Sequence, residues 1–399
     1  MGFNNFFEDV QDEFNYDEKR KELIDNLDTL KNMSVEEATL YKKWQEFNKN
    51  VDFHKFAYKF DVLEKKIWTP TDINNYDLTV SEIEALDPMI EIVDSSNQSS
   101  VENWTLLRRL IHSMEYVANP GRNVKIIAKD RNTGKVLGMM SLGSDVTSIA
   151  ARDKYIGWTK DNKFVDGKLR CTSIGTSIVA TQPLGYNFLG GKLVAMLLTS
   201  EELRVHWKKA YGDPLIGLTT TSLYGIHSMY NGIPLWKTLG ESTGKVSIKP
   251  DDSIYKPWMD WMKKEKAEDF KKISTQKEGV SGPPTGVKQQ ILSYIFRELG
   301  IRKVDYDHGY KRGIYFSSFY ENGRDFLRGD INDDSELVMR KQFVEGYDYI
   351  NKWWKKKAIK RYTKLHTENR LKPEILYYSD MLGMTWEEAK EKYLGEVGR

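Results

Sequence analysis

Cysteine is nearly missing from this sequence, and what is missing narrows the classes of protein to which it can belong. Cys171 is the one cysteine among 399 residues. This excludes an internal disulfide framework and a zinc site built from several cysteines. The six histidines are scattered and show no H-x-x-x-H spacing. We therefore expect no structural metal.

Long apolar runs are also missing, and none approaches the length needed to span a bilayer. The first residues, MGFNNFFEDVQDEF, are acidic and do not resemble the basic and then apolar pattern of a secretion signal. These two absences predict a cytoplasmic protein with no membrane partner. The hydrophobic content of 40% is typical of a globular chain, and the length is enough for two or three folded units.

The clearest local pattern lies between Ser173 and Ser200. Residues 173–181 are rich in β-branched side chains, which predicts a buried strand, and the following Pro and Gly end it. Residues 189–197 then predict a helix with two glycines in its first turn. Such a helix start offers unpaired backbone N–H groups to an anion, although glycines there also serve close packing. The candidate donor-binding residues are Gln182, Gly185, Asn187, Gly190 and Gly191.

The remaining patterns predict an α+β protein with four regions. Residues 1–118 are expected to be helical, 119–250 to form a mixed core, 251–286 to link, and 287–399 to form a basic, α-rich C-terminal region. Within the core, residues 124–130 and 135–142 predict a β-hairpin, and residues 215–220 a further strand. Neither a Walker loop nor a Rossmann glycine pattern follows the central strand.

Two polar, aromatic segments of this core are candidates for binding or chemistry. The run from Ala150 to Trp158 predicts either a solvated helix end or a ligand surface, with Arg152, Asp153, Tyr155 and Trp158 as its candidate residues. The loop at residues 224–232 contains Tyr224, His227 and Tyr230. These residues predict either an acceptor pocket or the edge of the core. Asp153, His227 and Tyr230 are the candidate catalytic residues, because a transferase needs a group that can accept a proton.

The order of hairpin, helical segment, strand, helix, strand and a final aromatic and glycine-rich segment resembles the core of the GNAT acyltransferases. In that family the strand–turn–helix binds a pyrophosphate. Its pattern, Q/R-x-x-G-x-G/A, is partly matched by Gln182-x-x-Gly185-x-Asn187 and by Asn187-x-x-Gly190-Gly191. The resemblance implies a donor that carries phosphate, such as an acyl-CoA-like molecule, whose identity stays unknown.

A narrower resemblance rests on residues 151–158, ARDKYIGW, with Tyr230-Asn231 and the later L-G-x-S-x-G run. These residues resemble the DruA-type family of the Druantia anti-phage system and, more distantly, the Mom DNA-modification proteins of phages. Mom-type enzymes resemble GNAT transferases and add a small group to adenine in DNA. This chain differs from the Mom-type pattern after the last core strand, where residues 219–222 replace an Asp.

Residues 351–364, NKWWKKKAIKRYTK, carry the strongest charge signal. Helical spacing places Lys356, Lys360 and Lys364 on one stripe, with aromatic residues between the cations. Such a run contacts nucleic-acid phosphates or is simply a solvated helix face. The candidate nucleic-acid-binding residues are Lys355, Lys356, Lys357, Lys360, Arg361 and Lys364.

Three functions remain open from the sequence. The first is a phage-encoded, DNA-modifying group transferase with adenine as the favoured base. The second is a DNA-binding module of a defence or counter-defence system that catalyses nothing. The third is an acyltransferase for a protein or small molecule, in which case the basic run would be a solvated face.

Overall fold

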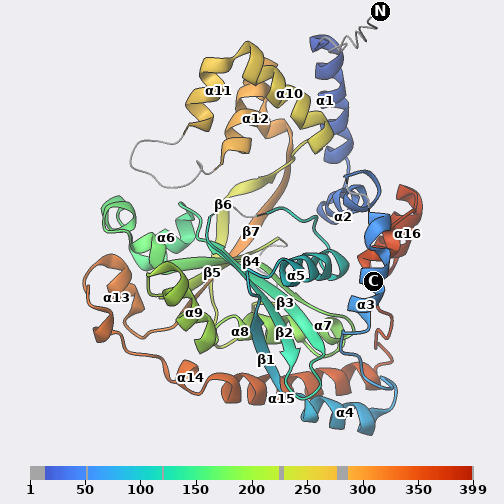
Figure 1. Ribbon diagram of the computed structural model, residues 1–399, viewed down its shortest axis with the longest axis vertical. Coiled ribbons are helices and arrows are strands. Elements are labelled where there is room, and N and C mark those ends of the chain that lie inside the picture. Colours follow the sequence, from blue (N-terminus) through green and yellow to red (C-terminus); the bar gives the residue numbers. More distant parts are fainter. Residues whose placement is uncertain (1–13, 51–52, 119–120, 224–228, 276–285, 398–399) are drawn as a thin grey trace, which may run out of the picture. The chain divides into compact units, whose positions relative to one another are not determined.

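The computed structural model describes residues 14–50, 53–118, 121–223, 229–275 and 286–397 (Figure 1). They group into two compact units, each formed by separate segments of the chain. One combines the described residues up to Ala38 with Val246–Gly309, and the other combines Thr39–Lys245 with Tyr310–Arg399. The division into four regions, at residues 1–118, 119–250, 251–286 and 287–399, stays a prediction. Within the described ranges, no helix is both long and apolar enough to cross a membrane.

A seven-stranded mixed sheet in the order β1-β2-β3-β4-β5-β7-β6 confirms the predicted α+β class. The ladder between β4 and β5 is parallel (Thr172 opposite Gly217). The ladders β1–β2, β2–β3, β3–β4 and β5–β7 are antiparallel. The strands are β1 (Pro88–Ile92), β2 (Asn123–Asp130), β3 (Val136–Ser144), β4 (Thr172–Ala180), β5 (Gly217–Ser222), β6 (Lys237–Ser247) and β7 (Asp307–Ser318).

Of the order expected from the GNAT resemblance, the hairpin, helical segment, strand, helix and strand are present between residues 123 and 222. The predicted hairpin is β2–β3, and the predicted central strand is β4. Strands β1 and β6 were not predicted from the sequence. Pro88, a residue type that is rare within strands, begins β1, where a missing N–H is tolerated because it is the first residue of an edge strand. Residues 237–247, which contain the L-G-x-S-x-G run, form β6.

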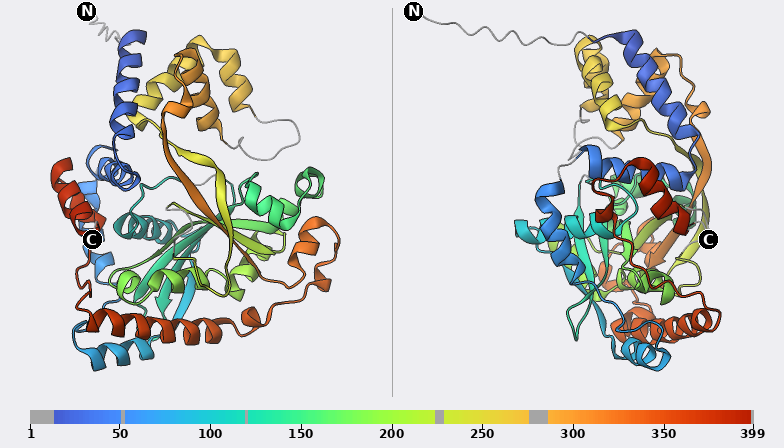
Figure 2. Two further views of the ribbon diagram at one scale, coloured as in Figure 1. Left: turned by 180° about the vertical axis from the view of Figure 1, so that it is seen from behind. Right: turned by 90° about the vertical axis from the view of Figure 1, so that its right-hand side faces the viewer.

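One face of the sheet is covered by a core that includes α8 and α15. Ile126 of β2 points into this core, with Leu193 of α8 and Trp354 of α15. Both α8 and α15 lie on the same side of the strands, and α15 runs beside α4 (Figures 1 and 2). The helices that contribute to this face are α4 (Tyr76–Ala85), α7 (Leu184–Asn187), α8 (Gly190–Leu197), α9 (Glu201–Tyr211) and α15 (Gly346–Thr367), with α14 (Lys341–Val344) preceding the last.

The opposite face carries two further clusters. Ile127 of β2 packs with Trp104 of α5 in the first, whereas Ile156 of α6 packs with Phe316 of β7 in the second. The contributing helices are α3 (Ala57–Glu64), α5 (Gln98–Ile111) and α16 (Trp386–Val397) in the first cluster, and α6 (Ala150–Ile156) and α13 (Gly323–Arg328) in the second.

The other unit consists mainly of helices, together with the last residues of β6 and the first residues of β7. Trp258 of α10 is buried there, and its ring packs against Tyr16 of α1 with 5.3 Å between centroids. Its helices are α1 (Tyr16–Lys31), α10 (Asp252–Glu265), α11 (Ala267–Ser274) and α12 (Val287–Glu298), while α2 (Val35–Gln45) spans the division between the units.

Candidate functional site

Arg152 is the centre of a network of charges on the α6 face of the sheet. Its side chain has no exposed surface. Nη1 lies 2.6 Å from Asp145 Oδ1, and Nη2 lies 2.7 Å from Asp153 Oδ1. Lys163 Nζ approaches the other oxygen of Asp153 at 2.5 Å, and Thr219 Oγ1 donates to Asp145 Oδ2 at 3.0 Å. The network thus connects the end of β3, α6, the following π-helical turn (Asp161–Val165) and β5.

Local sequence explains how this network is held. The helix α6 is short, because Gly157 adopts a left-handed φ of 86° and ends it. Burying the Arg152 guanidinium is costly, and the cost is offset only by close carboxylates. Both oxygens of Asp153 accept hydrogen bonds from cations within the protein, Arg152 and Lys163. These bonds occupy the carboxylate that would have to accept a proton if Asp153 acted as the predicted base. Asp145 was missed because nothing in the sequence indicates that it meets a residue seven positions later.

The two aromatic candidates of this run lie beside the network. The guanidinium carbon of Arg152 lies 5.1 Å from the ring centroid of Trp158, and Trp158 donates its Nε1–H to Leu327 O at 2.7 Å. Tyr155 packs edge-on against Phe316, with 5.9 Å between the ring centroids. The predicted substrate-binding residues Arg152, Tyr155 and Trp158 are thus brought together, but Arg152 and Trp158 bond to the protein itself. A role for them toward a substrate stays a prediction.

The predicted donor turn forms as a strand followed by two helices, α7 and α8. Gln182 Oε1 accepts from Tyr186 N, within α7, at 3.1 Å. The side-chain amide of Asn187 donates to Lys372 O at 2.7 Å, and its oxygen accepts from Lys372 N at 2.9 Å. These two candidate donor-binding residues, Gln182 and Asn187, therefore hold the backbone of the turn and the segment that follows α15.

The glycines of the turn lie in close contact with neighbouring residues. A Cβ added at Gly190 would lie 2.9 Å from Ala180 Cβ and 2.9 Å from Leu184 Cγ. At Gly191 it would lie 2.6 Å from the sulfur of Met229. At Gly185 it would meet the Gln182 amide at 2.6 Å. Close packing thus accounts for the glycines without a ligand, and the donor site stays a prediction.

Of the predicted acceptor loop, Tyr224 and His227 lie outside the described residues. Tyr230 is described and belongs to the core, with 7% of its surface exposed. Its ring packs against Tyr315 and Trp236, at 5.0 and 6.0 Å between centroids. Burial raises the pKa of Tyr230 to about 12, against the lowering effect of a hydrogen bond with Thr220. A phenol with that pKa is protonated at neutral pH and would not serve as a base.

The basic run forms part of α15, and its aromatic residues face the core. Trp354 and Tyr362 are buried, and their polar atoms donate to Phe188 O at 2.9 Å and to Ile73 O at 2.8 Å. The predicted stripe of Lys356, Lys360 and Lys364 is exposed on the other side of the helix. The aromatic residues therefore anchor α15, and the three lysines of the stripe face solvent, with Lys364 Nζ 3.8 Å from Glu368 Oε1.

The other cations of the run differ in their surroundings. Lys355 Nζ donates to Glu84 O at 2.7 Å, at the side where α4 packs. Lys357 is exposed, and Arg361 lies 5.1 Å from the ring centroid of Tyr186 in α7. The structure thus brings the basic run next to the predicted donor turn, two features separated by more than 150 residues in the sequence.

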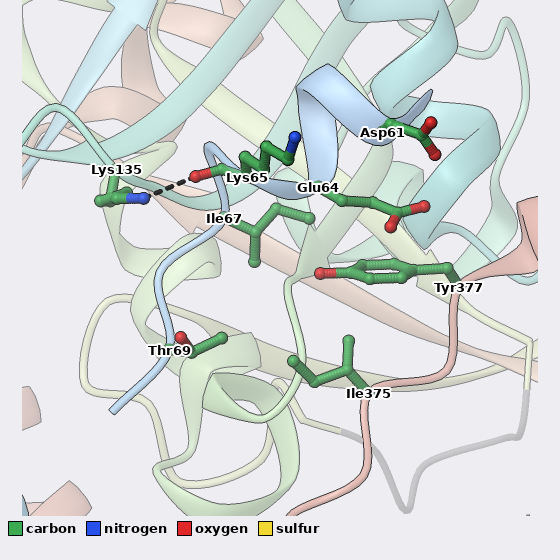
Figure 3. Close-up of a pocket in the computed structure, with 8 residues that line it drawn as sticks. All are labelled: Asp61, Glu64, Lys65, Ile67, Thr69, Lys135, Ile375 and Tyr377. Carbon is green, nitrogen blue, oxygen red and sulfur yellow. Dashed lines mark hydrogen bonds between the residues drawn. The ribbon is translucent and has the colours of Figure 1, made fainter. Parts of the chain in front are cut away.

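A separate pocket of about 430 Å³ lies away from these residues (Figure 3). Glu64 and the ring of Tyr377 lie beside each other in it, and burial raises the pKa of both, that of Tyr377 to about 12. None of the predicted site residues that the structure describes lines it. Its walls are formed by Asp61, Glu64, Lys65, Ile67, Thr69, Lys135, Ile375 and Tyr377.

Comparison with known proteins gives one consistent relationship. The family model described as Druantia protein DruA matches residues 47–329. The Druantia protein DruA of Escherichia coli (strain UMEA 4076-1) is 26% identical over 280 residues, which cover 65% of this chain and 66% of that relative, just under two thirds of its length. No solved structure matches significantly. The family match includes the network around Arg152 and ends before α15. Since it covers more than half of the chain, the protein belongs to the Druantia DruA family.

Proposed function

We propose that this protein is a DNA-binding component of a Druantia-type defence system and that it contacts the DNA backbone through α15. The observation that carries the proposal is the division of this helix into two faces. One face is fixed to the core by Trp354 and Tyr362, while Lys352, Lys356 and Lys360 are exposed on the other. Cations on a rigid element are what binding to phosphates requires, because neutralising phosphates releases bound counterions.

The surroundings of the exposed face favour binding over a mere solvated face. Among the described residues, Lys352, Lys356, Lys357 and Lys360 have no ion-pair partner. By contrast, exposed lysines of α10 and α11 lie near carboxylates, as in the pairs Lys263–Asp260 at 2.9 Å and Lys272–Asp269 at 3.4 Å. The unpaired charges of α15 form a local excess of positive charge on a chain with a net charge of only +2.

The base-modifying transferase is supported less well. The DruA relationship favours a defence component and gives no support to a Mom-like enzyme or to a phage origin. Asp153 is bound by two cations, and Tyr230 is buried. We therefore prefer a DNA-binding component without base-modifying activity.

The test compares two triple variants with the same change in charge. K356Q/K357Q/K360Q removes unpaired cations from α15, whereas K263Q/K272Q/K288Q removes cations that are paired with Asp260, Asp269 and Asp252. Fluorescence anisotropy with duplex DNA should show at least a tenfold weaker affinity for the first variant and less than about a threefold change for the second. Equal effects of both variants would leave only a general charge effect and would overturn the proposal.

A further inference from the structure

Two cations meet at one aromatic ring on the α6 face, away from α15. Tyr155 of α6 has Lys237 Nζ at 4.8 Å and the Arg324 guanidinium carbon at 4.6 Å from its ring centroid. The three residues come from α6, the first position of β6 and α13. Helices α6 and α13 lie side by side (Figures 1 and 2). The fold thus brings together residues that are far apart in the sequence.

Neither cation is neutralised within the described part of the chain. Lys237 and Arg324 have no ion-pair partner there, although acidic residues lie close in sequence to Arg324. Asp325 pairs with Arg328, and Glu321 lies 3.9 Å from Arg340. The carboxylate of Asp153, near Tyr155 in α6, is occupied by Arg152 and Lys163. The positive charges of Lys237 and Arg324 beside Tyr155 are therefore not neutralised by these nearby carboxylates, which pair with other cations.

Arg324 also carries a donor that lacks an acceptor. Its Nε–H is buried and makes no hydrogen bond with the described residues. The unsatisfied donor leaves the charge of Arg324 uncompensated there, so an anion beside the guanidinium would be bound favourably. Attraction to the ring explains how two like charges are held at this point, since the face of an aromatic ring attracts cations.

We propose that Tyr155, Lys237 and Arg324 form a phosphate-binding subsite. A carboxylate would be satisfied by the guanidinium alone through two parallel hydrogen bonds, and the ammonium of Lys237 would stay unmatched. A phosphate has more oxygens and more charge, so it can bond to both cations at once. Tyr155 acts as a positioning residue that holds the cations in place. The subsite goes beyond the proposed function, because it uses none of the α15 lysines.

The test measures binding of inorganic pyrophosphate by isothermal titration calorimetry, in a K356Q/K357Q/K360Q background that removes the α15 cations. R324Q and K237Q should each weaken binding about tenfold or more. Y155L should also weaken it, while Y155F, which keeps the ring, should not. R328Q is the matched control, because its guanidinium is already bonded to Asp325 and Asp330. No binding, equal loss in R328Q, or equally tight binding of acetate would overturn the subsite.

The source of the phosphate is separated by two further titrations in the same background. If the phosphate belongs to DNA, residual binding of an oligonucleotide falls when R324Q is added. If it belongs to a free nucleotide, AMP binds, R324Q abolishes this binding, and residual DNA binding is unchanged. Both results support the subsite, whereas R324Q without effect on either ligand contradicts it. All these measurements use a protein that lacks the three α15 lysines. Their outcome therefore tests the subsite even if α15 does not bind DNA.

Discussion

Arg152 carries its charge where the side chain has no exposed surface, so its carboxylate partners matter far more than those of a surface ion pair. Asp145 is equally buried and has Arg152 and Thr219 as its partners. Because a buried charge that loses a partner cannot turn to water, the network should act as a unit in holding α6 against the sheet.

Replacing Asp145 by Asn should therefore lower the free energy of unfolding by about 3 kcal/mol. Asp334, which pairs with Lys208 at 2.6 Å on the surface, provides the control, and D334N should cost less than about 1 kcal/mol. Urea denaturation of both variants gives the comparison. Replacing both partners, as in D145L/R152M, should recover much of the loss, and a D145N protein as stable as the wild type would contradict the role given to the network.

A second buried charge lies at Lys43, whose side chain has no exposed surface. Its Nζ is 2.9 Å from Glu46 Oε2, and the other oxygen of Glu46 accepts from Arg109 Nε at 2.9 Å. Burial lowers the pKa of Lys43 from 10.5 to about 8, although Glu46 acts in the opposite direction. The unfolded chain therefore binds more protons than the folded protein between these two values.

This difference predicts how stability depends on pH. Because stability rises with pH wherever the unfolded state binds more protons, Lys43 should add about 1–2 kcal/mol between pH 8 and about pH 9.5. Urea unfolding at both pH values, in the wild type and in K43M, measures this contribution as the difference between the two proteins. An identical pH dependence would mean that Lys43 titrates normally.

At the scale of elements, the residues of the turn between β4 and α8 pack closely against the core and hold the neighbouring backbone. Gly190 lies against Ala180 and Leu184, and Asn187 holds the backbone at Lys372. Replacement of the glycines by valine would therefore disturb the fold and could not test donor binding by itself. The sequence pattern identified the turn correctly, but it could not distinguish close packing from a ligand, because both need a residue without a side chain.

The packing account predicts a graded loss of stability. G190A should cost about 1–3 kcal/mol, because Cβ would meet the core residues Ala180 and Leu184. G191A should cost less, since the atom that it meets is the flexible side chain of Met229. Thermal unfolding of the two variants measures the difference, and equal melting temperatures would argue against close packing at Gly190.

Elements with a strong local pattern could be predicted, and those defined by distant partners could not. The hairpin β2–β3, the strand β4 and the basic helix follow from periodicity and turn residues within each segment. The strand β1 is short and begins with proline, so only its pairing with β2 reveals it. The glycines of β6 concealed a strand that neighbours β7 in the sheet.

For the whole molecule, the most informative contacts join segments that are far apart in the sequence. Asp145 meets Thr219, Tyr155 meets Lys237 and Arg324, and Trp354 donates to Phe188 O. The residue types at Arg152 and Tyr155 could be selected from the sequence, but their partners could not. The relation between the basic run and the predicted donor turn likewise depends on the tertiary fold.

Binding of DNA through α15 is tested most directly by how its affinity depends on salt. Each phosphate contact contributes roughly 0.9 to the slope of log K against log salt concentration on duplex DNA. If Lys356, Lys357 and Lys360 each contact a phosphate, K356Q/K357Q/K360Q should reduce the magnitude of the slope by roughly 2.7 relative to the wild type. Anisotropy titrations at several KCl concentrations provide both slopes. A slope that the three substitutions leave unchanged would contradict DNA binding by α15.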